Sequence, residues 1–311
     1  MRGLALAFLA ALAVLPASAQ QAFVTNQNSD DLTIVDLASL KPVATLPIGG
    51  KPAGIAMARD GTRAYVTSPE GKFVSVIDVA GRKVLRRIPV EGGPLGIAVA
   101  PDGARIYVAD WFSAQVVAID PASAQITGLA QVGASPSGIA FTPDGKLFLT
   151  ADRDDNQVSI VDAATMQRIG VVKVGERPFG LTVNAAGTLA YSADVGSDTV
   201  SIIDIAAQRL VGTVKVGNRP YAVALARGRG FVTDQYADAV SVFDLETLAP
   251  LAKIDVGDYP EGIEASADGR SVYVACWFAN ELQVIDVASL KVTGKVKVGD
   301  GPRAFGTFVG R

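Results

Sequence analysis

The stretch that decides the fold is GERPFGLTVNAAGTLAYSADVGSDTVSIIDIAAQRLVGTVKVG, residues 175–217. It begins with a Gly-x-x-Pro turn and continues with four short apolar runs that are rich in β-branched residues. Runs of this length and composition, bounded by turn-forming residues, indicate β-strands. The stretch is therefore predicted to form a unit of four antiparallel strands.

The same unit recurs along the rest of the chain. The turn prolines are 42 residues apart except for one spacing of 40, and an aspartate that ends each third run has identical spacings. Two markers in phase across seven copies define a repeat, and a period near 42 with four strands per copy is typical of a β-propeller. The prolines are Pro52, Pro94, Pro136, Pro178, Pro220, Pro260 and Pro302, and the aspartates are Asp36, Asp78, Asp120, Asp162, Asp204, Asp244 and Asp286.

The two ends of the chain differ in phase. The repeat starts on a second strand, residues 22–25, and finishes on a first strand, residues 303–309. Pairing the two would close a ring with three N-terminal strands and one C-terminal strand, and closure removes the exposed edge of an open array. A linear solenoid would need polar caps at both ends. We predict an all-β fold, a single seven-bladed β-propeller over residues 20–311.

Composition limits the chemistry. The 311 residues are 49% hydrophobic and 19% charged, with a net charge of −3. This balance does not favour electrostatic binding of nucleic acid. There is no histidine, and Cys276 is the only cysteine. This excludes Ser-His-Asp and Cys-His catalysis, His-ligated haem, His-based zinc or copper sites and an internal disulfide. We expect no catalytic residue and no cofactor.

Residues 1–19 have the pattern of a secretory signal peptide. Arg2 supplies the positive start, residues 4–15 are apolar, and Ala17-Ser18-Ala19 is a small-residue cleavage site. A membrane anchor is the alternative, but the apolar run is short for a span. We expect the mature chain to begin at Gln20, to lack a membrane span, and to reside in the periplasm or outside a bacterial cell.

Several strand motifs resemble a known family. Phe-Val-Thr-Asn at 23–26, Tyr-Val-Thr-Ser at 65–68 and Phe-Val-Thr-Asp at 231–234 begin second strands, and Val-Ser-Val-Ile-Asp at 74–78 and Val-Ala-Pro-Asp-Gly at 99–103 occur elsewhere in the unit. These are similar to the YVTN-type β-propeller repeat family, over residues 22–311. The resemblance implies a secreted or periplasmic seven-bladed propeller from a bacterium or archaeon. Relatives of this shape include binding proteins, surface-layer components and quinone- or haem-associated propellers.

The copies vary mainly on one face of the predicted ring. Strand alternation places the turns that enter the first strand and the loops between second and third strands on that face. The other face carries repeated turns such as Pro-Asp-Gly, and there the Asp36 series is expected to form turns. Because variation concentrates on the first face, we expect it to bind ligand.

Cationic and aromatic side chains gather on that variable face. Arginine forks suit carboxylate or phosphate, and neighbouring rings add stacking, so we predict a small anionic or aromatic ligand or a partner protein. In the alternative interpretation the rim arginines pair with Asp152, Asp194 or Asp258 and the aromatic rings wedge between blades. The predicted binding residues are Arg177, Phe179, Arg219, Tyr221, Trp111, Trp277, Tyr259, Arg303 and Lys51.

Four aspartates occupy one repeat position at the end of consecutive second strands: Asp110, Asp152, Asp194 and Asp234. As a set they are the only candidate for a cation site with oxygen ligands. They are expected to fan apart, and the favoured interpretation is that each accepts backbone N–H bonds in its own loop. Cys276 follows the same position in the last copy and is expected to be buried.

The sequence favours a non-catalytic, monomeric binding or scaffold protein that uses its variable face. A metal-dependent hydrolase resembling propeller lactonases is one alternative and would need the Asp110 series to converge. An accessory role in a periplasmic quinone-dependent dehydrogenase system is another and rests on the resemblance alone. The acidic balance argues against nucleic acid as a partner.

Overall fold

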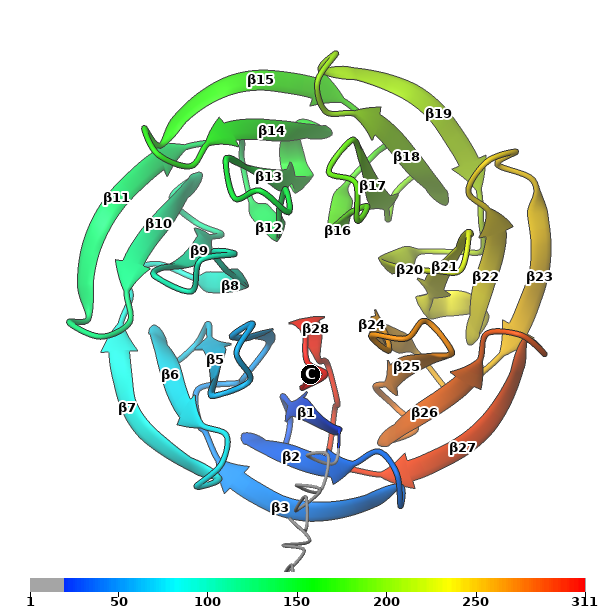
Figure 1. Cartoon of the computed structure of the whole chain (residues 1–311), viewed down its shortest axis with the longest axis horizontal. Helices are drawn as coiled ribbons and strands as arrows, with labels where there is room; N and C mark the ends of the chain where they lie inside the picture. Colours follow the sequence, from blue (N-terminus) through cyan, green and yellow to red (C-terminus); the bar gives the residue numbers. More distant parts are fainter. Residues whose placement is uncertain (1–19, 311) are drawn as a thin grey trace, which may run out of the picture.

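The computed structural model describes residues 20–310, which form a closed ring of seven antiparallel β-sheet blades around a central axis (Figure 1). The predicted all-β, seven-bladed propeller is confirmed. The predicted signal peptide lies outside the described residues. In the described part of the chain, no helix is long and apolar enough to cross a membrane.

The first strand of each blade lies nearest the axis and begins at or close to the repeated proline. Proline suits this place because it fixes φ and lacks an N–H that the strand would need in its interior. The first strands are β4 (Gly54–Met57), β8 (Pro94–Val99), β12 (Pro136–Phe141), β16 (Pro178–Val183), β20 (Pro220–Ala226), β24 (Pro260–Ala265) and β28 (Phe305–Thr307).

The second strands are nearly buried throughout, because they are covered by the adjacent blade on each side. Two short 3₁₀ turns, η1 (Arg153–Asp155) and η2 (Gln235–Ala237), follow the second strands of the fourth and sixth blades. The second strands are β1 (Gln21–Asn26), β5 (Arg63–Ser68), β9 (Ile106–Asp110), β13 (Leu147–Asp152), β17 (Leu189–Asp194), β21 (Arg229–Asp234) and β25 (Ser271–Cys276).

The third strands end at the repeated aspartate, which caps the following turn as predicted. In one example, Asp162 Oδ1 accepts the backbone N–H of Thr165 at 2.8 Å. Aspartate is favoured here because its short side chain hydrogen-bonds to backbone two or three residues onward. The third strands are β2 (Asp31–Asp36), β6 (Phe73–Asp78), β10 (Gln115–Asp120), β14 (Gln157–Asp162), β18 (Thr199–Asp204), β22 (Ala239–Asp244) and β26 (Glu281–Asp286).

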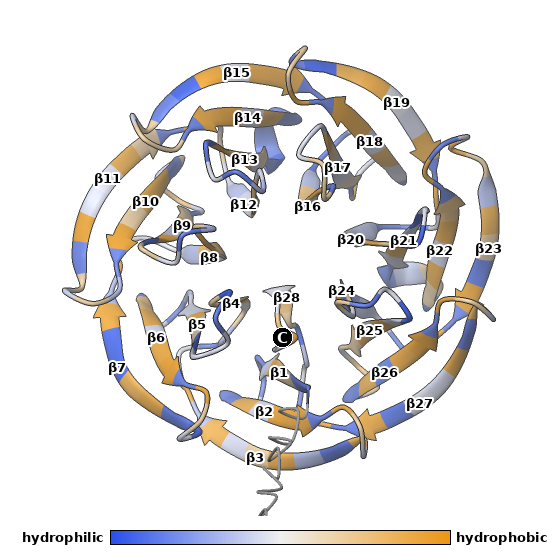
Figure 2. Ribbon diagram, in the orientation of Figure 1, coloured by the Kyte–Doolittle hydropathy of each residue, from blue (hydrophilic) through white to orange (hydrophobic). Residues whose placement is uncertain are grey.

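The fourth strands form the outer wall of the ring, and most of their side chains face solvent. Figure 2 shows them as mixed hydrophilic and hydrophobic ribbons, whereas third strands such as β18 and β22 are mostly hydrophobic. An inner strand has neighbours on both faces and so carries a continuous apolar run. The fourth strands are β3 (Lys41–Pro47), β7 (Lys83–Pro89), β11 (Gln125–Gln131), β15 (Gln167–Lys173), β19 (Arg209–Lys215), β23 (Pro250–Asp255) and β27 (Lys291–Lys297).

The ring closes where the C-terminal segment joins β1. Arg303 N–H donates to Thr25 O at 2.8 Å, and Gly310 N–H donates to Gln21 O at 2.7 Å. The blade therefore has three N-terminal strands and one C-terminal strand, as predicted. In addition, β28 runs parallel to β4 of the next blade over residues 305–307, so the closing strand links two blades.

The first strands approach one another closely at the glycine that follows the proline by two residues. A Cβ on Gly96 would lie 1.7 Å from Ser137 O, and one on Gly54 would lie 2.1 Å from Leu95 O. A side chain at these positions would therefore push neighbouring blades apart. This contact explains why glycine stands at this position in five of the seven copies, whereas Ala222 and Ala304 occupy it in the other two.

A threonine from the second strand bridges some of these blade pairs. Thr25 Oγ1 donates to Ala53 O at 2.9 Å, and Thr67 Oγ1 donates to Leu95 O at 2.6 Å. Each acceptor lies at the start of the next blade's first strand, where an unpaired buried carbonyl would cost about 1–3 kcal/mol. The threonine of the Phe-Val-Thr-Asn and Tyr-Val-Thr-Ser motifs thus has a structural role.

Candidate ligand-binding site

The loops that the sequence placed on one face lie side by side. Trp111, in the loop after β9, donates its backbone N–H to Gly93 O at 3.0 Å, in the turn that enters β8. The other blades show the same pairing, for example Trp277 N–H with Tyr259 O at 2.9 Å. We call this side of the ring the loop face and the opposite side the turn face.

The residue before the turn proline adopts a left-handed backbone conformation in most blades. Arg219 has φ of 59° and Tyr259 has φ of 57°. Non-glycine residues rarely adopt this conformation without support, and here the support comes from the previous blade. Asp198 Oδ1 accepts the Arg219 N–H, and Asp238 Oδ1 accepts the Tyr259 N–H, each at 2.8 Å. Each turn is thereby held in place on the loop face.

A cavity of about 450 Å³ opens on the loop face, over blades three to seven and the closing C-terminal segment of the first blade. We call it the loop-face cavity. Its walls come from two repeat positions, the residue after the turn proline and the residue after the aspartate position of the second strand, together with a few neighbours. The lining residues are Trp111, Arg153, Phe179, Val195, Arg219, Tyr221, Gln235, Tyr259, Glu261, Trp277, Phe278 and Arg303.

The lining includes seven of the nine residues that the sequence predicted, and leaves out two of the cations. The Arg177 side chain is exposed, and this residue is held by its backbone N–H on Asn156 Oδ1 at 2.8 Å. Lys51 Nζ lies 3.2 Å from Asp30 Oδ2 in the first blade. Arg177 therefore differs from Arg219, although both stand before proline in adjacent blades with an aromatic residue after it.

Aromatic rings form the floor of the loop-face cavity. The ring centroids of Phe179 and Tyr221 are 4.5 Å apart, and those of Phe179 and Phe305 are 4.9 Å apart. These rings come from β16, β20 and β28, so they meet across the axis. All three are buried. Phe179 and Tyr221 line the loop-face cavity, and Phe305 packs against them.

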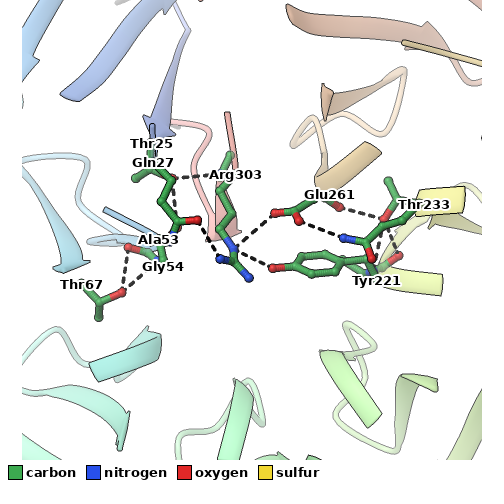
Figure 3. Close-up of polar contacts among 12 residues, drawn as sticks. Thr25, Gln27, Ala53, Gly54, Thr67, Tyr221, Thr233, Glu261 and Arg303 are labelled. Atoms are coloured by element: carbon green, nitrogen blue, oxygen red, sulfur yellow. Dashed lines mark hydrogen bonds and ion pairs between the residues drawn. The ribbon is translucent and has the colours of Figure 1, made fainter. Parts of the chain in front are cut away.

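Arg303 lies at the centre of a polar network on this floor (Figure 3). Its Nε donates to Tyr221 Oη at 2.8 Å and lies 3.2 Å from Glu261 Oε2, and its Nη1 donates to Gln27 Oε1 at 3.1 Å. The side chain of Arg303 is 18% exposed and that of Glu261 is 6% exposed. Burial raises the pKa of Glu261 to about 6, and the neighbouring charge of Arg303 opposes that rise.

The network continues to a second arginine. Gln235 Nε2 donates to Glu261 Oε1 at 2.8 Å, and Arg219 Nε donates to Gln235 Oε1 at 2.7 Å. The Arg219 guanidinium also lies 4.9 Å from the ring centroid of Tyr236. Because the Nε atom of each arginine is used inside the network, the guanidinium orientation is fixed. Within residues 20–310, Arg219 forms no ion pair.

The remaining wall combines tryptophan with a third arginine. Arg153 lies 5.6 Å from the ring centroid of Trp111 and forms an ion pair with Asp154. On the other side, Arg303 lies 5.8 Å from the ring centroid of Trp277. The cavity therefore offers flat ring faces beside guanidinium groups, an arrangement that suits a planar, negatively charged molecule.

Five lining residues were not predicted from the sequence: Arg153, Val195, Gln235, Glu261 and Phe278. Three of them occupy the repeat position already marked by Trp111 and Trp277, so that position was the available signal. In the alternative interpretation, the rim arginines pair with Asp152, Asp194 or Asp258. None of these pairs is among the ion pairs of the described residues.

Each of the four aspartates at the ends of second strands accepts hydrogen bonds from groups of its own blade, on the loop-face side. Asp194 is typical, because it accepts from Ser192 at 2.9 Å, Ser201 at 2.7 Å and Thr199 at 3.1 Å. Burial raises its pKa to about 6. In residues 20–310, no group of three or more Cys, Asp or Glu side chains is arranged to hold a metal ion.

Cys276 occupies the aspartate position in the last blade and is fully buried. Burial raises the pKa of its thiol to about 12. The thiolate is the reactive form of cysteine, so this residue is suited to packing rather than to chemistry at neutral pH.

A larger cavity, of about 680 Å³, opens on the turn face. We call it the turn-face cavity. Its walls are the first strands of the blades and the turns that follow them, and they consist mainly of small and aliphatic residues such as Ala98, Ile139 and Val223. Phe305 lines the turn-face cavity, and its ring contacts Phe179, which lines the loop-face cavity.

These features define a class of protein: a closed seven-bladed propeller with a cationic, aromatic cavity on its loop face. The chain belongs to the YNCE-like β-propeller family, whose model matches residues 7–100, 94–227 and 222–309. The expected membership of a propeller family is therefore shown, and the narrower YVTN-type assignment stays a prediction. No curated protein matches the sequence significantly.

Solved structures share the fold at low sequence identity. Hydrazine synthase from Kuenenia stuttgartiensis is 21% identical with a TM-score of 0.72, over 81% of this chain and 88% of that one. A functionally unknown protein from Desulfotomaculum acetoxidans is 17% identical with a TM-score of 0.78, over 91% and 99%. Dihydro-heme d1 dehydrogenase NirN, solved in complex with DHE, is 17% identical with a TM-score of 0.70, over 92% of this chain and 66% of that one. At these identities the similarity concerns the fold alone.

Proposed function

We propose that this protein is a non-catalytic binding protein that holds a small, planar, negatively charged molecule in the loop-face cavity. The observation that carries the proposal is the placing of three arginines beside two tryptophans in one cavity of about 450 Å³. Small-molecule sites commonly have volumes of about 300–1,000 Å³ and a few fixed polar groups among apolar walls.

Hydrogen bonds preorganise two of the arginines for binding an anion. Gln235 holds Arg219 by its Nε at 2.7 Å, and Tyr221 holds Arg303 by its Nε at 2.8 Å. A guanidinium held in this way loses little side-chain entropy when it binds a carboxylate with its remaining N–H groups. The network therefore supports binding by orientation as well as by charge.

The aromatic walls supply the second part of the recognition. Trp111 and Trp277 lie in the loops of the third and seventh blades, and both line the cavity. Aromatic faces add favourable stacking with a planar ligand, of about 1 kcal/mol per ring pair beyond the buried area. An aromatic carboxylate satisfies both the arginines and the rings.

The proposal assigns the protein to the periplasm or the outside of a bacterial cell, because residues 1–19 have the pattern of a signal peptide. There it would capture or carry its ligand. An accessory role beside a quinone-dependent dehydrogenase is compatible with such capture and rests on family resemblance only.

The test compares benzoate with benzamide by titration calorimetry. The two molecules have nearly the same shape, but only benzoate is charged. We expect saturable binding of benzoate and affinity at least about tenfold lower for benzamide, because the neutral amide forms no ion pair with arginine and presents one acceptor oxygen where the carboxylate presents two. Equal affinity for both would contradict an anion site, and heat from neither would contradict a ligand site of this class.

A further inference from the structure

The loop-face cavity contains one carboxylate among its lining residues, Glu261, and this is unexpected in a site for anions. The side chain is 6% exposed and comes from the position after the turn proline, where β24 begins. A buried acid beside the proposed ligand lowers the affinity for negative charge. Its presence therefore bears on how much charge the ligand carries.

Each of the three arginines that line the cavity has an identifiable partner. Arg153 forms an ion pair with Asp154, and Arg303 lies 3.2 Å from Glu261. Arg219 has a neutral partner, Gln235, and makes no ion pair in the described part of the chain. Two of the three guanidinium charges are thus compensated by a carboxylate, and one is not.

We infer that the loop-face cavity selects singly charged anions over doubly charged ones, and that Glu261 is the residue that sets this preference. The inference rests on the proposed function and narrows its ligand class to aromatic monoanions. A monoanion meets the uncompensated charge of Arg219. A second negative charge would have to lie near the buried carboxylate of Glu261, where like charges repel.

The groups that face Glu261 support this assignment. Arg303 approaches from the segment before β28, Gln235 from η2, and Tyr221 from β20. The charge of Arg219 lies on the far side of Gln235, which contacts both Glu261 and Arg219. Tyr221 and Gln235 are neutral near pH 7. Since burial raises the pKa of Glu261 to about 6, protonation of this carboxyl leaves Arg303 as a second uncompensated cation.

The experiment measures the affinity of benzoate and of terephthalate, its dianionic counterpart, by calorimetry at about pH 8, well above the pKa of Glu261. Wild-type protein is expected to prefer benzoate by about tenfold. In Glu261→Gln, which keeps the size and the hydrogen-bonding capacity of the side chain, the preference should shrink by about tenfold. The matched control is Asp258→Asn, three residues earlier, which removes an exposed negative charge outside the cavity lining and should leave the preference unchanged.

If the Glu261→Gln variant does not fold, a second measurement on wild-type protein tests the same inference. Wild-type protein is titrated with benzenesulfonate and benzene-1,4-disulfonate, which stay ionised, at about pH 5 and about pH 8. The preference for the monoanion should shrink at the lower pH.

The outcomes separate the inference from the proposed function. Terephthalate binding as tightly as benzoate in the wild type, or an equal preference in wild type and Glu261→Gln, would overturn the role of Glu261 while leaving the anion site intact. Binding of neither benzoate nor terephthalate would contradict the proposed function and the inference together.

Discussion

The loop-face cavity and the turn-face cavity lie on opposite faces of the ring, and their walls have different chemistry. The loop-face cavity has three arginines, a glutamate and aromatic rings, whereas small and aliphatic side chains dominate the turn-face cavity. Within each face the repeat gives the copies a similar backbone, and the loop-face cavity is lined mainly at positions where the residue type changes from copy to copy. In this molecule those positions mark the candidate site.

The largest effect is expected from Arg303→Ala. The change removes a cation from the loop-face cavity and leaves Glu261 buried without an ionic partner, a loss of about 3–5 kcal/mol in the free energy of unfolding. Benzoate binding should disappear at the same time. Thermal unfolding and calorimetry give the two readouts.

The control for this change is Arg59→Ala, which removes an exposed arginine from the turn-face cavity. It should change neither stability nor benzoate affinity. Equal effects of the two substitutions would contradict the distinction between the cavities.

Carboxylates on the two faces should respond oppositely to pH. Burial raises the pKa of Asp194 on the loop-face side to about 6, from 3.8. The N–H and hydroxyl of Thr165 lower the pKa of Asp162 on the turn face. A raised pKa means that the folded state binds the proton more tightly, so the stabilisation is complete below about pH 4 and is lost as pH rises through about 6.

Stability should therefore fall by about 2 kcal/mol between about pH 4.5 and about pH 7 because of Asp194. In Asp194→Asn the slope should decrease by this contribution, while Asp234 and Glu261, whose pKa values burial also raises to about 6, still titrate. Asn26 occupies the equivalent position in the first blade, where its Nδ2 donates to Thr33 Oγ1 at 2.8 Å. Urea unfolding across this pH range measures the slope, and an unchanged slope in the variant would refute the assignment.

A smaller effect is expected from Arg219→Gln, compared with Arg177→Gln in the neighbouring blade. The two arginines stand in the same sequence context, but only Arg219 lines the loop-face cavity. The first change should lower benzoate affinity by about tenfold, which corresponds to one charge-assisted hydrogen-bonded contact. The second should leave the affinity unchanged. The reverse order would show that the ligand binds outside the cavity.

The smallest effect is expected from Thr182→Val in the turn-face cavity. Thr182 Oγ1 donates to Val223 O at 2.6 Å and so links β16 to β20. Loss of this hydrogen bond should lower stability by about 1 kcal/mol without changing benzoate affinity. A clear loss of binding would connect the turn-face cavity to ligand capture and break the comparison.

The sequence predicts the propeller well because the repeat expresses local rules. Strand alternation, the turn aspartates such as Asp162 and the unpaired strands at the two ends are each readable within one copy or from the phase of the ends. Ring closure by three strands and one followed from that phase, and the structure places Arg303 N–H on Thr25 O accordingly.

The candidate site is only partly predictable, because it depends on side chains that meet from distant copies. Arg177 and Arg219 are indistinguishable in sequence, and their different places come from the position of each blade around an asymmetric cavity. The contacts of Arg303 with Tyr221 and with Gln27 join residues 82 and 276 positions apart. No local pattern specifies such pairs. Glu261 follows its turn proline as Phe179 and Tyr221 do, so its place was readable from the repeat, whereas its ion pair with Arg303 was not.

The central claim is that an aromatic monoanion binds in the loop-face cavity, and the most direct measurement is tryptophan fluorescence. The chain has two tryptophans, Trp111 and Trp277, and both line this cavity. Titration with benzoate should change the emission in a saturable way, with the same midpoint as the calorimetric binding curve, and Arg219→Gln should shift that midpoint by about tenfold. A saturable calorimetric signal without any change in emission would place the ligand elsewhere and contradict the account.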